Sequence, residues 1–129
     1  MSELVAAMPF AGRLGLRVEA ATKDEVRGEL EWAEELCTAG GVLHGGALMA
    51  AADSVGALCA FLNLPEGATT ATIESKTNFF RAVRGGTVSL VATPLHLGRT
   101  SIVVQTDVRD AEDRRVALVI QTQAVQSSR

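Results

Sequence analysis

Hydrophobic and polar residues alternate with a period of two over much of the chain, a pattern that predicts β-strands. Residues 18–32 are predicted as one strand, because apolar and charged side chains there occupy opposite parities: Val26, Leu30 and Trp32 on one, and Arg27, Glu29 and Glu31 on the other. A short helix over residues 3–8 is predicted before this strand, with its end at Pro9.

Four further extended runs follow in the second half of the chain: residues 69–80, 87–97, 101–109 and 115–125. Two of them have residues in phase, which are Ile102, Val104, Thr106 and Val108 in the third run and Val116, Leu118 and Ile120 in the fourth. Short turns connect the runs, and short connections predict antiparallel neighbours in a sheet.

Between the first strand and these runs lies the most apolar stretch of the chain, GVLHGGALMAAADSVGALCAFL, residues 41–62. Its composition favours a helix from Gly45 to about Leu62, after a predicted loop at residues 34–41 and before helix-ending residues 63–67. A helix that is apolar on all sides must be covered on nearly all of them. We therefore predict an α+β domain in which a curved antiparallel sheet wraps around one long buried helix, with one side left for a second subunit.

Length and composition predict a single domain, residues 1–129, with 47% hydrophobic and 21% charged residues. The net charge of −3 argues against nucleic acid as a partner. No membrane association is expected, because the N-terminal residues do not read as a secretory signal and Asp53 interrupts the one apolar stretch of span length. Cys37 and Cys59 match no disulfide or metal spacing, so we expect free thiols and a cytoplasmic location.

Asp53 stands in the middle of the predicted helix, and its position allows two interpretations. In the structural one, the carboxylate is hydrogen-bonded within the fold or to a partner chain, and the glycines at 45 and 46 permit close packing. In the chemical one, the first turn of the helix presents backbone N–H groups that have no partner within the helix. Gly45 or Gly46 leaves room for a carbonyl group to approach, and such an amide stabilises the oxyanion that forms on it. Asp53 then attacks that carbonyl or activates a water.

The spacing of these residues constrains the chemical interpretation. Gly45 and Asp53 are eight residues apart, which is roughly 12 Å along one helix. Both cannot touch one reacting carbon from the same chain. If they act on one bond, the acid comes from one chain and the amide from another, so the active unit is a homodimer with two symmetric sites.

The segment HGGALMAAAD resembles the start of the buried helix in hotdog-fold thioesterases, most closely the phenylacetic-acid-degradation and 4-hydroxybenzoyl-CoA thioesterase type. The resemblance covers residues 10–125 and includes SKTNFFRAVRGG, residues 75–86, and LHLGRTSIVVQTDV, residues 95–108. HGG alone is a weak motif, but HGG with a helical acid and these later segments in order is specific. The resemblance implies acyl-CoA thioester hydrolysis in a homodimer that assembles into a tetramer. It implies no metal and no cofactor, since coenzyme A is part of the substrate.

By position, the resemblance assigns four catalytic residues. Asp53 matches the catalytic carboxylate and Gly45 the oxyanion-binding amide, while His44 matches the motif histidine that shapes the helix start. Thr72 falls where some relatives have a hydroxyl that positions the attacking water.

Two positions depart from the family pattern. Thr38 stands six residues before His44, where relatives often carry Asn or Gln. Ala57 stands one turn after the acid, where others have Ser or Thr. Ser54 is a possible substitute hydroxyl, although it points to a different face of the helix.

The phosphates of coenzyme A favour arginine side chains and exposed backbone amides. Arg81, Arg84 and Arg99 lie at predicted strand ends or turns, and the turn glycines 85, 86 and 98 would let a phosphate approach the backbone. The predicted substrate-binding residues are Thr38, Gly46, Arg81, Arg84, Gly98 and Arg99. Residues 55–61, Phe79, Phe80 and residues near Phe10 are expected to line an acyl pocket.

Other functions fit the same scaffold. A non-catalytic acyl-CoA-binding or regulatory module would bind acyl-CoA without releasing a thiol. A dehydratase needs a histidine and an acid placed together, and the chain has only His44 and His96. A serine hydrolase is disfavoured because no G-x-S-x-G motif is present, and two separated histidines predict no metal site.

Overall fold

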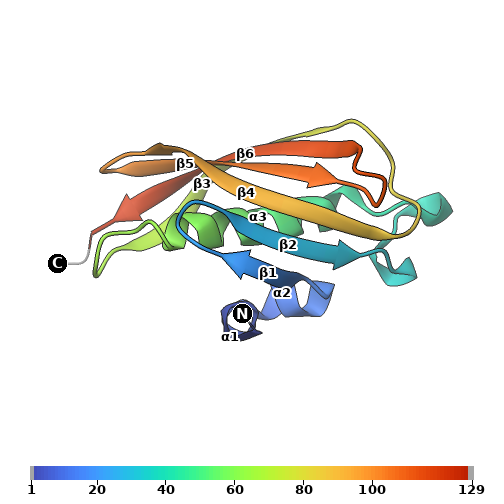
Figure 1. Ribbon diagram of the computed structural model, residues 1–129, viewed down its shortest axis with the longest axis horizontal. Helices are drawn as coiled ribbons and strands as arrows, with labels where there is room; N and C mark the ends of the chain where they lie inside the picture. The colour runs from blue at the N-terminus through green and yellow to red at the C-terminus, as the bar shows by residue number, and fades with distance from the viewer. Residues whose placement is uncertain (1, 128–129) are drawn as a thin grey trace.

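The computed structural model describes residues 2–127, which form two short N-terminal helices, one long helix and one sheet (Figure 1). In chain order the elements are α1 (Ser2–Ala6), α2 (Pro9–Leu14), β1 (Arg17–Ala21), β2 (Val26–Glu31), the 3-10 turns η1 (Glu34–Leu36) and η2 (Ala39–Gly41), α3 (Gly45–Phe61), β3 (Thr69–Phe79), β4 (Thr87–Leu97), β5 (Ser101–Arg109) and β6 (Arg115–Gln126). The strands pair in the order β1-β2-β4-β5-β6-β3, and every neighbouring pair is antiparallel.

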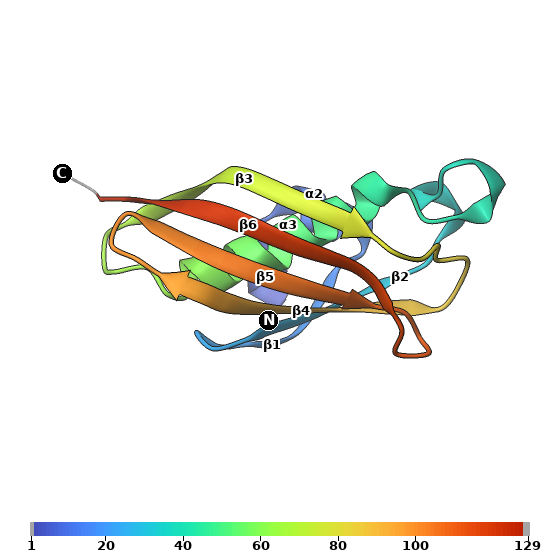
Figure 2. The same cartoon turned by 90° about the horizontal axis from the view of Figure 1, so that it is seen from above.

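Helix α3 lies under the curved sheet and contacts all its strands (Figure 2). The N-terminal helix α2 packs on another side of α3, and α1 packs on α2 and β1. This arrangement confirms the predicted hotdog architecture of a sheet wrapped around one buried helix. Among residues 2–127, no helix has both the length and the apolar character needed to cross a bilayer.

The core between helix and sheet is aliphatic. Of the described side chains, the largest fully buried ones are Val26, Leu30, Val55, Val88, Leu90, Ile102, Val104, Val108, Val116, Val119, Gln121 and Gln123. Two primary amides thus lie in a layer of branched hydrocarbon. Because a buried amide without hydrogen bonds is costly, these glutamines require polar partners close by.

The predicted strand over residues 18–32 is wrong, since this segment forms a hairpin of two strands, β1 and β2. The hydroxyl of Thr22 accepts hydrogen bonds from the backbone N–H groups of Asp24 and Glu25 and so closes the turn. Near the N-terminus, the first helix does end before Pro9, as predicted. Pro9 then begins a second helix, where its fixed φ suits the first turn.

The predicted pairing of β3 with β4 is also wrong. Strand β3 lies at one edge of the sheet beside β6, whereas β4 pairs with β2 and β5. Three strand spacings, about 14 Å, separate them, and the connecting residues 80–86 are long enough to cross that distance. The backbone N–H of Leu43 donates to the carbonyl of Val83, whose side chain is buried, so the connection is tied down where α3 begins.

The inward face of β6 differs from the expected one. The predicted apolar phase of β5 is confirmed, with all four of its residues buried. In β6 the residues that alternate toward the helix are Ala117, Val119, Gln121 and Gln123, while Leu118 and Ile120 face outward and are partly exposed. The sequence pattern is misleading here because two polar residues occupy core positions.

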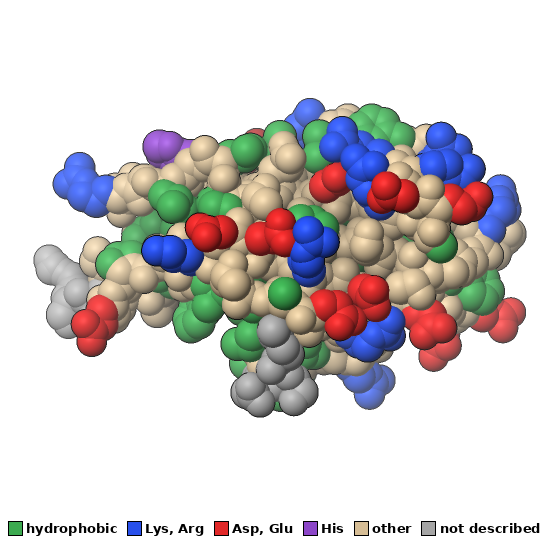
Figure 3. Space-filling model, viewed as in Figure 1, with side chains coloured by type: hydrophobic (Ala, Val, Ile, Leu, Met, Phe, Trp, Pro, Cys, Tyr) green, Lys and Arg blue, Asp and Glu red, His purple; other side chains and the backbone are tan. Residues whose placement is uncertain are grey.

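The two ends of the molecule carry different segments. Helix α3 begins beside residues 80–86 and the β5–β6 turn, and charged side chains of both signs gather toward that end (Figure 3). The β4–β5 turn and the end of α3 lie at the opposite end (Figure 1).

Candidate active site

Asp53 projects from the middle of α3 toward β3 and β6 and is half-buried. Its carboxylate oxygen Oδ1 accepts a hydrogen bond from the Thr72 hydroxyl at 3.1 Å and another from the Gln121 amide nitrogen Nε2 at 3.0 Å. Within residues 2–127, no donor contacts the other oxygen, Oδ2. One oxygen is therefore held by the fold, and the second remains free to react.

A chain of hydrogen bonds continues behind the carboxylate. The Oε1 atom of Gln123 accepts from Thr72 at 2.6 Å and from Gln121 at 3.0 Å. The amide nitrogen of Gln123 donates to the Thr70 hydroxyl at 3.2 Å, and that hydroxyl donates to the carbonyl of Ala124 at 2.7 Å. The amide nitrogens of both buried glutamines, and the Oε1 atom of Gln123, thus find their partners around Asp53.

A β-bulge in β3 makes this arrangement possible. Thr72 pairs with Gln123 and Glu74 pairs with Thr122, so three residues of β3 oppose two of β6. The extra residue is Ile73, whose side chain is 66% exposed. Bulges re-aim side chains next to functional sites, and this one keeps Thr72 directed at the helix.

Gln121 and Gln123 are not among the residues that the sequence predicts for the site. The signal in the sequence that could have found them is their alternation with Ala117 and Val119, which places all four side chains on the same face of β6. That strand lies next to the strand that carries Thr72. Two buried glutamines on one strand face, next to a helix that carries an acid, indicate a polar network.

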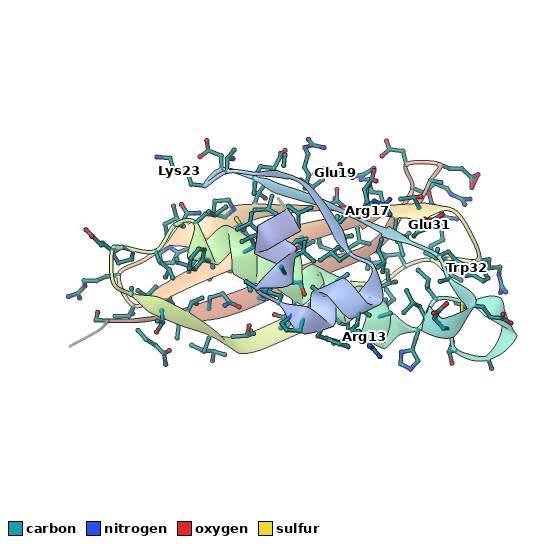
Figure 4. The ribbon with its side chains drawn as sticks, turned by 90° about the horizontal axis from the view of Figure 1, so that it is seen from below. Arg13, Arg17, Glu19, Lys23, Glu31 and Trp32 are labelled. Atoms are coloured by element: carbon teal, nitrogen blue, oxygen red, sulfur yellow. The ribbon has the colours of Figure 1, made fainter. Side chains whose placement is uncertain are left out.

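The start of α3 is fixed by three hydrogen bonds. His44 caps the helix, and its Nδ1 accepts from the backbone N–H of Gly46 at 2.8 Å. The His44 backbone N–H donates to the carbonyl of Leu36, and the Trp32 indole donates to the carbonyl of Gly41 at 3.0 Å. Figure 4 shows Trp32 beside the loop that precedes the helix.

The backbone N–H of Gly45 has no acceptor among the described residues, whereas the backbone N–H of Gly46 already donates to the His44 side chain. A free amide at the positive end of a 17-residue helix favours a negatively charged oxygen. Of the two glycines in the predicted site, the geometry therefore favours Gly45 as the oxyanion donor.

A pocket of about 390 Å³ opens at this amide. It brings together Thr38, Gly45 and Arg81, along with Phe79 and Phe80. The Phe79 ring packs on Gly45 so closely that a Cβ at position 45 would lie 3.0 Å from its Cζ atom. A glycine at this position leaves room for the approach of a carbonyl and lets the Phe79 ring pack against the backbone.

The predicted phosphate ligands fall into two groups. Arg81, Arg84 and the glycines at 85 and 86 line a pocket of about 560 Å³ whose other wall includes Asp110, Glu112 and Arg114. Gly98 and Arg99 lie at the opposite end of β4, an 11-residue strand that is roughly 35 Å long. One protomer does not bring the two groups together.

The predicted acyl-pocket residues are also divided. Ala57, Leu58 and Phe61 line an apolar pocket of about 230 Å³ with Leu4, Ala7, Met8 and Thr70. Phe79 and Phe80 belong instead to the pocket at Gly45, and Phe10 lines a further pocket beside His44 and Gly46. Asp53 does not line the first of these pockets, but two of the residues that do are linked to it: Ala57 lies one turn further along α3, and Thr70 belongs to the hydrogen-bond chain.

Among the described residues, none of the remaining candidates is hydrogen-bonded to the Asp53 carboxylate. The Ser54 hydroxyl donates to the carbonyl of Ala50 at 2.8 Å, so it does not substitute for a hydroxyl at position 57. His96 lies near the β4–β5 turn, at the other end of the sheet from His44. Cys37 and Cys59 are both free, as predicted, and Cys59 is fully buried.

Comparison of the sequence and the structure with known proteins identifies the family of this chain. Residues 40–117 match the family model of the Thioesterase superfamily. A candidate esterase from Haemophilus influenzae is 36% identical over 101 residues, 78% of this chain and 73% of that protein. The crystal structure of a thioesterase from Haemophilus influenzae superposes with a TM-score of 0.90 at 31% identity, covering 95% of this chain and 86% of the other.

A mutant thioesterase from Pseudomonas aeruginosa superposes with a TM-score of 0.91 at 26% identity, covering 97% of this chain and 92% of that one. The family match runs without a break from the end of the loop before α3, through α3, β3, β4 and β5, to the first residues of β6. It therefore includes Gly45, Asp53 and Thr72. The chain is therefore a hotdog-fold member of the Thioesterase superfamily, a family of thioester hydrolases.

Proposed function

We propose that this protein hydrolyses acyl-CoA thioesters, with Asp53 as nucleophile or general base and the Gly45 amide as oxyanion donor. The observation that carries the proposal is the asymmetry of the Asp53 carboxylate, which has one oxygen held by Thr72 and Gln121 and the other free. A reacting acid needs one oxygen available for a carbonyl carbon or a water, and this arrangement leaves Oδ2 available while the fold sets its direction.

Two routes use this geometry. In one, Oδ2 of Asp53 bonds to the thioester carbon, the C–S bond breaks, coenzyme A leaves as the thiolate and water hydrolyses the resulting anhydride. In the other, Oδ2 takes a proton from a water that attacks the carbon directly. The Gly45 N–H stabilises the oxyanion in both routes. Single-turnover hydrolysis in heavy-oxygen water separates them, because label enters the Asp53 carboxylate only in the first.

The helix geometry supports a homodimer as the active unit. Met49 lies four residues from Gly45 and four from Asp53, and its side chain is 38% exposed. If two copies of α3 run antiparallel about a two-fold axis at Met49, Gly45 of one copy lies level with Asp53 of the other. Each dimer then has two sites, and each site draws one group from each chain.

The edge strand β3 supports the same pairing. It is 11 residues long, most of its side chains are exposed, and Ile73 and Phe79 are 66% and 48% exposed. A long exposed edge strand that carries apolar side chains is a template for pairing with another chain. Two such dimers would cover the outward face of the sheet, including Ile120, in a tetramer.

Substrate binding follows from the pockets around the site. The apolar pocket at Ala57, Leu58 and Phe61 is proposed to hold the acyl group. The Arg81 and Arg84 pocket, next to the Gly45 pocket, is proposed to hold the phosphates of coenzyme A. The helix start HGG and the acid at Asp53 support a place in the phenylacetic-acid-degradation and 4-hydroxybenzoyl-CoA thioesterase type, and the free thiols fit a cytoplasmic enzyme.

An acyl-CoA panel tests the proposal. Acetyl-, hexanoyl-, lauroyl- and benzoyl-CoA are incubated with the protein, and released coenzyme A is measured with a thiol reagent. We expect at least one member to be turned over by the wild type and not by Asp53→Asn. Binding without thiol release from any member would instead favour a non-catalytic acyl-CoA-binding module.

A further inference from the structure

We infer that Gln121 is the positioning residue of the reacting carboxylate, and that Gly56 is a glycine because Gln121 needs the space. The inference rests on the proposed function in one respect, which is that Asp53 is the reacting acid. It assigns a role to two residues that the superfamily match does not single out, one in the core of β6 and one on α3 three residues after Asp53.

The orientation of the Gln121 amide is fixed by its neighbours. Its nitrogen has two hydrogens, and two acceptors lie at 3.0 Å: Oδ1 of Asp53 and Oε1 of Gln123. A flipped amide would place its oxygen against both of these oxygens, where no hydrogen is present to bridge them. Gln121 therefore donates to Asp53 in the only arrangement that these contacts allow.

Thr72 is a less dependable partner for the acid. Its hydroxyl has one hydrogen and two acceptors, Oε1 of Gln123 at 2.6 Å and Oδ1 of Asp53 at 3.1 Å. When the hydrogen lies on the shorter contact, Gln121 is the remaining donor to Oδ1 among the described residues. The orientation of the carboxylate, and with it the direction of Oδ2, then depends on Gln121.

Gly56 makes room for this amide. A Cβ at position 56 would lie 2.0 Å from Oε1 of Gln121 and 2.6 Å from its Cδ, distances that real Cβ atoms do not show. The glutamine is fully buried at this point, so its side chain has no open space to move into. Any larger residue on α3 here forces Gln121 away from Asp53.

The fold retains Gln121 at a cost to its stability. Its Oε1 atom is buried and has no hydrogen-bond donor in the described part of the chain. A buried carbonyl without a donor is unfavourable, and an apolar side chain of similar shape avoids that cost. A core position that accepts such a cost is expected where function needs the group.

Gln121→Met tests the inference, because methionine keeps the length and volume and removes both N–H donors. We expect kcat to fall about tenfold to a hundredfold, the range for losing a hydrogen bond to a charged group. KM should stay within about twofold, because Gln121 does not reach the substrate. Thermal stability should change little, because the loss of the two donated hydrogen bonds is offset by removal of the buried Oε1 that has no donor among the described residues. Gln105→Met, on the outward face of β5, is the matched control and should leave kcat unchanged.

Gly56→Ala should lower kcat similarly, and it should also lower stability because the new Cβ displaces Gln121. Gly12→Ala is its control, since the nearest atom to a Cβ there is Val5 Cγ1 at 3.9 Å. In a Gln121→Ala background the stability cost of Gly56→Ala should disappear, because the clashing amide is gone.

The outcomes separate the inference from the proposed function. If the wild type is active, Asp53→Asn is inactive and Gln121→Met keeps full kcat, only the inference is overturned. A Gln121→Met protein that loses stability together with activity also overturns it, because the side chain is then structural. A wild type that hydrolyses no member of the panel overturns the proposed function, and the inference falls with it.

Discussion

Replacement of Asp53 by asparagine and by alanine should have different effects on activity and stability. In Asp53→Asn, the new Oδ1 can still accept from Thr72 and Gln121, so the hydrogen-bond chain stays closed. The amide nitrogen then takes the place of Oδ2, and it has no free lone pair with which to attack a carbon or accept a proton. The fold and the dimer should therefore persist while the chemistry stops.

The expected size of the loss follows from the role of Oδ2. A positioned general base contributes about 10²–10⁴ in rate, which corresponds to roughly 2.7–5.4 kcal/mol of barrier at 1.36 kcal/mol per tenfold. The free energy of unfolding should change by less than about 1 kcal/mol, since the two bonds to Oδ1 persist. Asp53→Ala should lose the same activity and also about 1–3 kcal/mol of stability, because a buried Gln121 donor loses its acceptor.

The assay combines thiol release from the acyl-CoA panel with urea denaturation of the wild type and both variants. An asparagine variant that retains more than about a tenth of wild-type kcat would refute the role of Asp53 in the reaction. An asparagine variant as unstable as the alanine variant would refute the hydrogen-bond assignment to Oδ1.

Three further changes test other parts of the account. Thr72→Val keeps the shape and removes the hydroxyl, so kcat should fall about tenfold, and Thr72→Ser should restore it; equal rates for both variants would exclude the hydroxyl. Met49→Asp should place two carboxylates at the proposed two-fold axis, so sedimentation velocity should show monomers without activity, and an active dimer would contradict the axis. Burial, with a smaller effect from Asp24, raises the pKa of Cys59 from an ordinary 9.0 to about 11. The unfolded thiol therefore ionises first, and the free energy of unfolding should fall as pH rises from 9 to 11; a Cys59→Ala variant with the same pH slope would contradict this.

Local patterns in the sequence were sufficient for much of the fold. The bounds of α3 follow from the run of small apolar residues between Gly45 and Phe61, and the strands β3 to β6 follow from alternation between clear turns. The turn at Thr22 is different, because it is closed by a hydroxyl bonded to the backbone and contains neither glycine nor proline. The path of residues 80–86 from β3 to β4 includes a long-range hydrogen bond from Leu43 to Val83, which no local pattern records.

The face of β6 could not be predicted for a reason that concerns the site. Alternation indicates that glutamines face solvent and that Ile120 faces the core, whereas the structure has Gln121 buried and Ile120 partly exposed. The reversal follows from hydrogen bonds to Asp53 and Thr72, which lie on other elements. Asp53 and Gly45 were predicted from their spacing and from the family motif, but the residues that support Asp53 became visible only when β6 was placed beside α3.

The central claim is that Gly45 and Asp53 of different chains act on one thioester, and mixed dimers test it most directly. Gly45→Pro removes the amide N–H, and the extended backbone of His44, with φ −62° and ψ 133°, admits a proline after it. The new Cβ also crowds the Phe79 ring beside the same amide, so the damage stays at the site that Gly45 serves. Gly45→Pro and Asp53→Asn homodimers should both be nearly inactive. A purified heterodimer of the two contains one site with both groups intact, so it should recover about half of wild-type turnover. If the two groups act within one chain, every site of the heterodimer is defective, and an inactive heterodimer would contradict the account.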